Sequence, residues 1–158
     1  MSEHKDRPGI IAPPPLLTLA AIGAALLADH YFHVALLPER WSRLRTPVAA
    51  VLAVAAVALS VAGNVEFRRH QTTPNPYRPS STVVSSGVFA FTRNPMYVAF
   101  LTMVAAVAVG ANTTWGIIAL IALFIVLDLG VVKREERYLS AKFGVTYDEY
   151  RKAVRRWV

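Results

Sequence analysis

Apolar residues gather in four stretches along the chain, separated by polar and charged segments. The stretches cover residues 16–37, 47–65, 96–109 and 115–132. A helix needs roughly 20 apolar residues to cross about 30 Å of hydrocarbon, and the first, second and fourth stretches are long enough. Because the bilayer core holds no water, such segments must be helices that satisfy their own backbone groups. The pattern predicts an all-α, polytopic membrane protein with about four transmembrane helices.

The third stretch is short, and the polar turn Gly110-Ala111-Asn112-Thr113-Thr114 follows it directly. This arrangement predicts a tight helical hairpin over residues 95–132. The hairpin has a clear start, because Asn94 suits the N-cap and Pro95 suits the first helical position.

The fourth helix is expected to continue beyond the membrane to about Phe143, where Gly144 ends it. A short cytoplasmic helix should follow, because Thr146 and Glu149 have the spacing of a capping box. One apolar face of this final helix is expected to carry Phe143, Tyr147, Tyr150, Val154 and Trp157.

Composition supports the membrane interpretation. Of 158 residues, 54% are hydrophobic and 17% are charged, whereas soluble domains have about a quarter charged. The net charge of +7 raises the question of nucleic acid, but the basic residues flank apolar blocks, which favours a membrane and no nucleic-acid partner. The chain has no cysteine, which excludes disulfides and cysteine-based nucleophiles or zinc sites. No metal site is predicted.

The distribution of Lys and Arg predicts the orientation. One side of the predicted topology carries 14 of these residues and the other carries 3, so both termini and the 66–94 loop should face the cytoplasm. A cleaved signal peptide is disfavoured, because prolines 13–15 separate Lys5 and Arg7 from the first apolar run.

The chain therefore divides, within a single membrane domain, into five parts. They are a cytoplasmic tail (1–15), two spans (16–65), a proline-rich cytoplasmic loop (66–94), the hairpin (95–132) and a cytoplasmic tail that could bind a cofactor (133–158).

Three cytoplasmic pieces carry candidate chemistry. The start of the third helix, with Arg93 beside it, favours an anion. The adjacent carboxylates of Glu135 and Glu136 point to different sides of a helix. Tyr147 and Tyr150 could line a nucleoside pocket. From the residues alone, each piece also has an ordinary explanation: a capped helix end at the membrane boundary, surface ion pairs, or a docking surface.

Ionisable residues within the spans are a separate signal, because intramembrane charge often marks function. Asp29, His30 and His33 lie near the outer end of the first span, and Asp128 lies near the cytoplasmic end of the fourth. These positions favour interfacial placement or helix pairing. At the end of the second span, His70 is a candidate base.

The order of these pieces resembles a known family. Thr72-Thr73-x-Asn75-Pro76 precedes Ser86-Gly87-Val88-Phe89 and Thr92-Arg93-Asn94-Pro95-Met96-Tyr97. The hairpin follows, and then Glu135-Glu136-x-x-Leu139-x-x-x-Phe143-Gly144-x-x-Tyr147-x-x-Tyr150. From about residue 68 to 157, this is similar to the bacterial branch of the isoprenylcysteine carboxyl methyltransferase family, which is related to the phospholipid methyltransferases.

The resemblance implies methyl transfer from S-adenosylmethionine at the cytoplasmic membrane face. The cofactor-binding residues carried over are Arg93, Asn94, Pro95, Tyr97, Glu135, Glu136, Tyr147 and Tyr150. Arg93 and Glu136 are taken as the catalytic pair. This chain has Asn94 and Ala99 at two positions where many relatives have His and Gly, respectively.

Two other functions are weighed against this one. Membrane reductases of related fold bind NADPH in a comparable pocket, although the short loops here leave little room for a dinucleotide. A non-enzymatic four-helix transporter or scaffold would need a polar pathway through the spans. The acceptor, whether carboxylate, amine or thiol on a lipophilic or small molecule, and the oligomeric state are not specified by the sequence. The expected location is a bacterial-type inner membrane.

Overall fold

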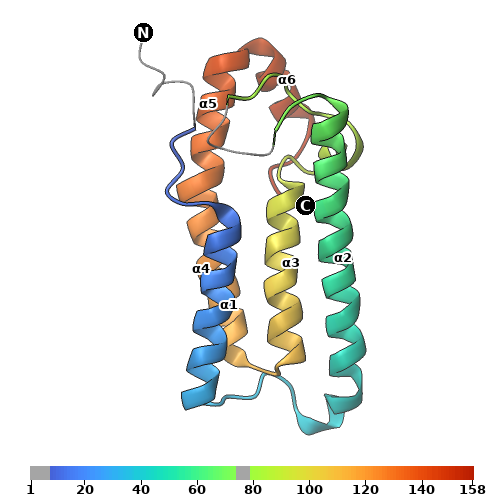
Figure 1. Cartoon of the computed structure of the whole chain (residues 1–158), viewed down its shortest axis with the longest axis vertical. Coiled ribbons are helices and arrows are strands. Elements are labelled where there is room, and N and C mark those ends of the chain that lie inside the picture. The colour runs from blue at the N-terminus through green and yellow to red at the C-terminus, as the bar shows by residue number, and fades with distance from the viewer. Residues whose placement is uncertain (1–7, 74–78) are drawn as a thin grey trace.

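The computed structural model describes residues 8–73 and 79–158, and this part of the chain is helical with one isolated β-bridge (Figure 1). The α-helices are α1 (Pro14–Tyr31), α2 (Ser42–Arg69), α3 (Pro95–Gly110), α4 (Thr114–Leu127), α5 (Lys133–Phe143) and α6 (Val145–Ala153). Two 3₁₀ turns, η2 (Glu39–Trp41) and η3 (Gly87–Ala90), and a π-helical turn, η4 (Asp128–Val132), complete the fold. The all-α prediction is confirmed.

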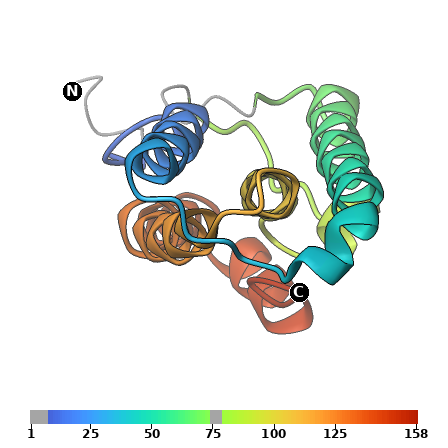
Figure 2. The same cartoon turned by 90° about the horizontal axis from the view of Figure 1, so that it is seen from below.

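The long helices form a bundle with α3 at its centre. α3 packs against α2 and α4, and α1 packs against α4 and α3. Seen along the bundle, α1 and α2 lie apart on different sides of α3 (Figure 2). The hydrophobic core lies mainly between α3 and the α4–η4 segment, with Val104, Leu123, Leu127 and Val131 at its centre.

Two helices are long and apolar enough to cross a membrane by length and composition: Glu39–Arg69 and Thr114–Phe143. α3 is a shorter apolar helix of 16 residues, and the count of four spans stays a prediction. Val51, Val54 and Val61 of α2 are each more than half exposed. A soluble protein rarely exposes such a contiguous apolar face, so α2 has the surface of a lipid-facing helix.

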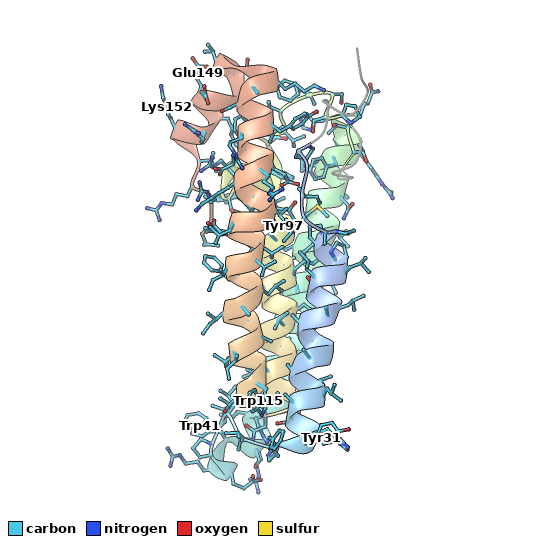
Figure 3. The ribbon with its side chains drawn as sticks, turned by 90° about the vertical axis from the view of Figure 1, so that its left-hand side faces the viewer. Tyr31, Trp41, Tyr97, Trp115, Glu149 and Lys152 are labelled. Carbon is cyan, nitrogen blue, oxygen red and sulfur yellow. The ribbon has the colours of Figure 1, made fainter. Side chains whose placement is uncertain are left out.

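The two ends of the bundle differ in character. Tyr31, Trp41 and Trp115 lie at one end, and Glu149 and Lys152 of α6 lie at the other (Figure 3). Aromatic residues are enriched where a membrane meets water. The first described residues, the loop before α3 and the C-terminus are all at the α6 end (Figure 1), as the predicted topology requires. The cytoplasmic orientation of this end stays a prediction, and Lys5 and Arg7 lie outside the described residues.

The α3–α4 hairpin forms as predicted, and Asn112 stabilises its turn. Its side chain accepts a hydrogen bond of 2.8 Å from the Leu37 backbone N–H and donates one of 3.3 Å to the Leu37 carbonyl. Asn112 has a φ of +54°, a conformation that Asn tolerates better than most residues. The first apolar stretch is helical only to Tyr31, since residues 32–38 cross to this turn and pair with it.

Local predictions at the C-terminus were partly right. The fourth helix does reach Phe143, and Gly144 ends it with a φ of +53°. However, α6 begins at Val145 without a side-chain cap, so the Thr146 capping box is wrong. The predicted apolar helical face through Trp157 is also wrong, because α6 ends at Ala153 and Val154 is extended.

Candidate active site

A cavity of about 400 Å³ lies at the α6 end of the bundle, between the N-terminal segment, the start of α3, α5, α6 and the loop before α3. All eight residues expected to bind the cofactor line it: Arg93, Asn94, Pro95, Tyr97, Glu135, Glu136, Tyr147 and Tyr150. Prolines 13–15 and Phe67 lie on other walls. The tail therefore folds over the start of α3, as the predicted pocket requires.

Arg93 is the buried cation of this cavity. Its side chain is 9% exposed, and Nη1 lies 3.0 Å from Glu136 Oε1. Neither Nε nor Nη1 has a hydrogen-bond partner of good geometry, so the contact with Glu136 is an ion pair by distance without a directed N–H bond. Burying such donors unpaired is costly. A guanidinium with two free N–H groups at a cavity wall suits a carboxylate ligand, which can accept both.

Glu136 is held by a different arginine. Arg156 Nε donates to Oε1 at 2.9 Å, and Nη2 donates to Oε2 at 2.7 Å. This is a bidentate pair, the strong geometry for Arg and carboxylate. The pairing raises the pKa of Arg156 above its ordinary value, chiefly through the hydrogen bond to Glu136. Because Arg156 compensates Glu136, the Arg93 donors stay available to a ligand.

Arg156 is placed by the last residues of the chain, which run back along the start of α3. The Arg93 backbone N–H donates to the Arg155 carbonyl at 3.0 Å. The Thr92 hydroxyl and the Asn94 side-chain amide both donate to the Arg156 carbonyl, at 3.1 and 2.9 Å. Asn94 thus occupies the predicted N-cap position of α3 without capping it, and it holds the C-terminal segment instead.

Asp128 anchors the same segment from the π-helical turn η4. Its carboxylate accepts from Trp157 Nε1 at 3.2 Å and from Arg156 Nη1 at 3.4 Å, and Lys133 lies 3.4 Å away. Trp157 also packs on Phe124 at 5.0 Å between ring centroids. These contacts are with the non-helical C-terminal segment and with the next turn of the same helix, so the expected helix pairing or interfacial placement of Asp128 stays a prediction. π-helical turns often occur at functional sites because they displace side chains from the regular helical register.

Glu135, next in sequence to Glu136, has a different environment. The Tyr97 hydroxyl donates to both of its oxygens, at 2.7 and 2.8 Å. Glu135 belongs to α5, the polar part of the helix beyond its apolar span. Burial raises the pKa of its carboxyl to about 7, the hydrogen bond from Tyr97 partly opposes this, and the Glu136 charge adds to it. The two carboxylates therefore have different partners, although both line the same cavity.

Two tyrosines of α6 close the cavity from the other side. Their rings contact at 6.1 Å in an edge-on arrangement, and the Tyr150 hydroxyl donates to the Phe89 carbonyl at 2.7 Å. Burial raises the pKa of both hydroxyls. Tyr147 and Tyr150 therefore stay protonated, and present aromatic surface together with Phe89.

His70, the candidate base, is not among the cavity-lining residues. It belongs to a polar cluster around Glu66, which accepts from Ser86 Oγ at 2.6 Å and from Arg69 Nη1 at 3.0 Å. Gly87 has a φ of +57°, and an added Cβ would lie 2.7 Å from Glu66. This cluster holds η3, and with it Phe89, against the end of α2. Asp29 and His33 pair at 3.1 Å near the opposite end of the bundle.

Sequence reasoning missed the contribution of Arg156, Thr92 and Trp157, because a basic terminal segment gives no local sign of a bidentate ion pair. The Asn75-Pro76 part of the motif lies outside the described residues. No metal-binding group of three or more His, Asp or Glu is present among the residues that the structure describes.

A second hollow adjoins the cavity. A groove of about 630 Å³ runs between α1 and α2, with α3 as its floor, and opens toward the side of the bundle. Pro15 and Phe100 line both the groove and the cavity. Ala99, one of the two departures from the family pattern, lies on the groove floor.

Comparison with known proteins identifies the family. Residues 44–146 match the phospholipid methyltransferase family. This chain belongs to that family. The match covers more than half of the chain, including the hairpin, the paired glutamates and the start of α6, and the family is the one related to the isoprenylcysteine carboxyl methyltransferases. The chain is therefore a membrane methyltransferase by family. No curated protein and no solved structure matches it.

Proposed function

We propose that this protein transfers a methyl group from S-adenosylmethionine to a lipophilic acceptor at the cytoplasmic face of a bacterial-type inner membrane. The observation that carries the proposal is the Arg93 guanidinium, which is buried at a cavity wall with no hydrogen-bond partner for Nε or Nη1, although Nη1 forms an ion pair with Glu136. S-adenosylmethionine has a carboxylate that can accept hydrogen bonds from these two nitrogens. It also has an aromatic adenine and a cationic sulfonium.

The cavity residues fit that ligand by chemistry. Arg93 and the start of α3 would hold the carboxylate, where guanidinium and helix dipole both favour an anion. Tyr147, Tyr150 and Phe89 would cover the adenine, because aromatic side chains stack on bases. Carboxylates on α5 lie where they can attract the sulfonium. The bound cofactor supplies an activated methyl group on positive sulfur.

The protein's own contribution is mainly positioning. Holding acceptor and donor in line can account for about 7–11 kcal/mol of a barrier. The Arg156–Glu136 pair and the C-terminal segment fix Arg93 from one side, and the Glu66 cluster fixes η3 from the other. The groove between α1 and α2 supports a lipophilic acceptor, because an apolar chain can occupy it while the polar head reaches the cavity past Phe100.

Cofactor binding tests this proposal. Titration calorimetry in detergent micelles should show binding of S-adenosylmethionine and of S-adenosylhomocysteine to the wild type, and no comparable binding of NADPH. Arg93→Ala and Glu136→Ala should each weaken binding at least tenfold. Arg137→Ala is the control for Arg93→Ala, since it also removes one positive charge, but at an exposed residue of α5 that does not line the cavity. Unchanged affinity in both cavity variants, or preferential NADPH binding, would refute the assignment.

A further inference from the structure

A basic hollow of about 560 Å³ lies outside the cavity, between α5, α6 and the C-terminal segment. Four of its lining residues are basic: Lys133, Arg137, Arg151 and Arg156. One is acidic, Glu136, and this residue also lines the cavity. None of the four basic residues lines the cavity. The basic hollow is therefore a separate site that shares one wall with the cavity.

The carboxylates at the start of the basic hollow already have cationic partners. Both oxygens of Glu136 accept hydrogen bonds from Arg156. Asp128, from the adjoining turn η4, lies 3.4 Å from Lys133 and 3.4 Å from Arg156. Two of the four basic residues are thus engaged within the protein.

The other two basic residues, Arg137 and Arg151, have no such partner. Arg137 Nε donates to the Lys133 backbone carbonyl at 3.2 Å, which is an uncharged acceptor. Asp148 of α6 accepts instead from the Ser140 hydroxyl, at 2.6 Å. Neither arginine forms an ion pair with any residue that the structure describes, and both are exposed. Two uncompensated guanidinium groups, one from α5 and one from α6, therefore line the basic hollow.

The basic hollow begins where the apolar surface of the long helix Thr114–Phe143 ends. Ile121 is 57% exposed, Ile125 is 48% exposed and Leu129 is 54% exposed. Leu129 lines the hollow, and Lys133, four residues further along the chain, does so as well. A molecule in the hollow would meet cations with one part and the exposed apolar surface with another, so the site suits an amphiphilic anion.

We propose that the basic hollow binds the phosphate of an anionic phospholipid, whose acyl chains lie along the exposed apolar side of α4. A guanidinium binds phosphate oxygens in a two-pronged geometry, and basic pockets at the cytoplasmic ends of membrane helices suit anionic headgroups. The hollow lies at the end of the bundle that is predicted to face the cytoplasm. This proposal does not depend on the methyltransferase function.

The charge of the basic hollow disfavours a zwitterionic lipid. Such a headgroup brings its own cation into a site lined by four basic residues and one acidic residue, which is electrostatically unfavourable. An amine lipid, for example, would be bound less well than a lipid with an uncharged group beyond its phosphate. The bound lipid is therefore distinct from a methyl acceptor in the cavity.

A lipid in this position would also join two helices. Arg137 belongs to α5 and Arg151 to α6, and one phosphate has enough oxygens to accept from both. α6 carries Tyr147 and Tyr150, which line the cavity. We expect lipid binding to hold α6 against α5 and so to slow hydrogen exchange of the α6 backbone amides.

Trp157 provides a local reporter of the bound lipid. Its indole N–H donates to Asp128, which is paired with Lys133 of the basic hollow. Trp41 and Trp115 lie at the other end of the bundle (Figure 3). A Trp41→Phe/Trp115→Phe background therefore leaves one tryptophan, close to the hollow. In phosphatidylcholine vesicles, bromine on the acyl chains of added phosphatidylglycerol or phosphatidylcholine quenches its fluorescence on contact, which gives the relative affinity of the two lipids.

The reporter protein should prefer phosphatidylglycerol to phosphatidylcholine. Arg137→Gln/Arg151→Gln should lower this preference roughly 25-fold, at about fivefold for each basic residue near an anionic headgroup. Lys152→Gln/Arg155→Gln is the matched control, because it removes the same charge from exposed residues of the same end that do not line the hollow. It should lower the preference by less than about threefold. With the native tryptophans in place, phosphatidylglycerol should slow α6 exchange in the wild type and in the control but not in Arg137→Gln/Arg151→Gln.

Three results would overturn the proposal. Equal losses of preference in the two double variants would show that only the general charge of this end attracts the lipid. Relief of quenching by inorganic phosphate, at the concentration of the anionic lipid, would show a site for free phosphate. An equal preference for brominated phosphatidylethanolamine would show that the site takes zwitterionic lipids. None of these measurements uses S-adenosylmethionine, so failure of the methyltransferase function would leave them unchanged.

Discussion

Replacing Arg156 by alanine should weaken cofactor binding although the arginine itself is not among the cavity-lining residues. The variant removes two charge-assisted hydrogen bonds to Glu136, of 2.9 and 2.7 Å, and a weaker contact with Asp128 at 3.4 Å. Glu136 is 9% exposed, so it then needs another partner. The nearest cation is Arg93, already 3.0 Å away, and we expect its guanidinium to turn toward Glu136.

The size of the expected loss in cofactor affinity follows from these contacts. Hydrogen bonds to charged groups contribute about 1.5–3 kcal/mol each, and stripping a buried charge of all partners costs about 3–5 kcal/mol. Because Arg93 can take over part of the pairing, we expect a loss of about 2 kcal/mol in cofactor binding. At about 1.4 kcal/mol per tenfold change, this is roughly a 30-fold rise in Kd for S-adenosylhomocysteine.

Calorimetric titration of the wild type and three variants measures this effect. Arg155→Ala removes the same charge from the neighbouring, exposed residue and keeps the backbone carbonyl that accepts from Arg93. Its affinity should stay within threefold of the wild type. Arg156→Lys keeps the charge but not the two-pronged geometry, so its affinity should be intermediate. Equal losses in Arg155→Ala and Arg156→Ala would show that general electrostatics matters and that the Arg156–Glu136 pair does not position Arg93.

Two further variants separate stability from binding. Asn112→Ala removes both hydrogen bonds to Leu37 at the far end of the bundle, so the free energy of unfolding in detergent should fall by about 1–3 kcal/mol while cofactor affinity is unchanged. Asn112→Gly keeps the positive φ and should lower the free energy of unfolding by less. Equal losses in the two variants would show that the positive φ of Asn112 does not contribute. Gly87→Ala places a Cβ against Glu66 at a φ of +57°. It should destabilise the protein by about 1–3 kcal/mol and weaken cofactor binding, since η3 carries Phe89; an unchanged melting temperature would contradict the role given to this turn.

The features that the sequence predicted well depend on neighbouring residues. The α3–α4 hairpin follows from a polar turn between two apolar runs, and Asn94-Pro95 marks the start of α3 by local steric rules. The long helix through Lys133 to Phe143 follows from an uninterrupted pattern closed by Gly144. Periodicity and turn chemistry act over a few residues, so they can be read without knowing the tertiary structure.

The features that the sequence did not predict depend on distant residues. Apolar residues spaced three and four apart suggested a helix through Trp157, but the Trp157 side chain is instead hydrogen-bonded to Asp128, 29 residues earlier. Arg156 looked like one of several terminal basic residues, and its pairing with Glu136 arises only when the chain turns back along α3. Likewise, nothing local distinguishes Glu135 from Glu136, although tertiary contacts give one a tyrosine and the other two arginines.

A structure determined with S-adenosylhomocysteine in the presence of lipid tests the central claim most directly. The ligand should lie in the cavity between α3, α5 and α6, with its carboxylate within hydrogen-bond distance of Arg93 Nε and Nη1 and its adenine against Tyr147 or Tyr150. A ligand bound outside this cavity, or one inside it that leaves both Arg93 nitrogens without a partner, would contradict the account.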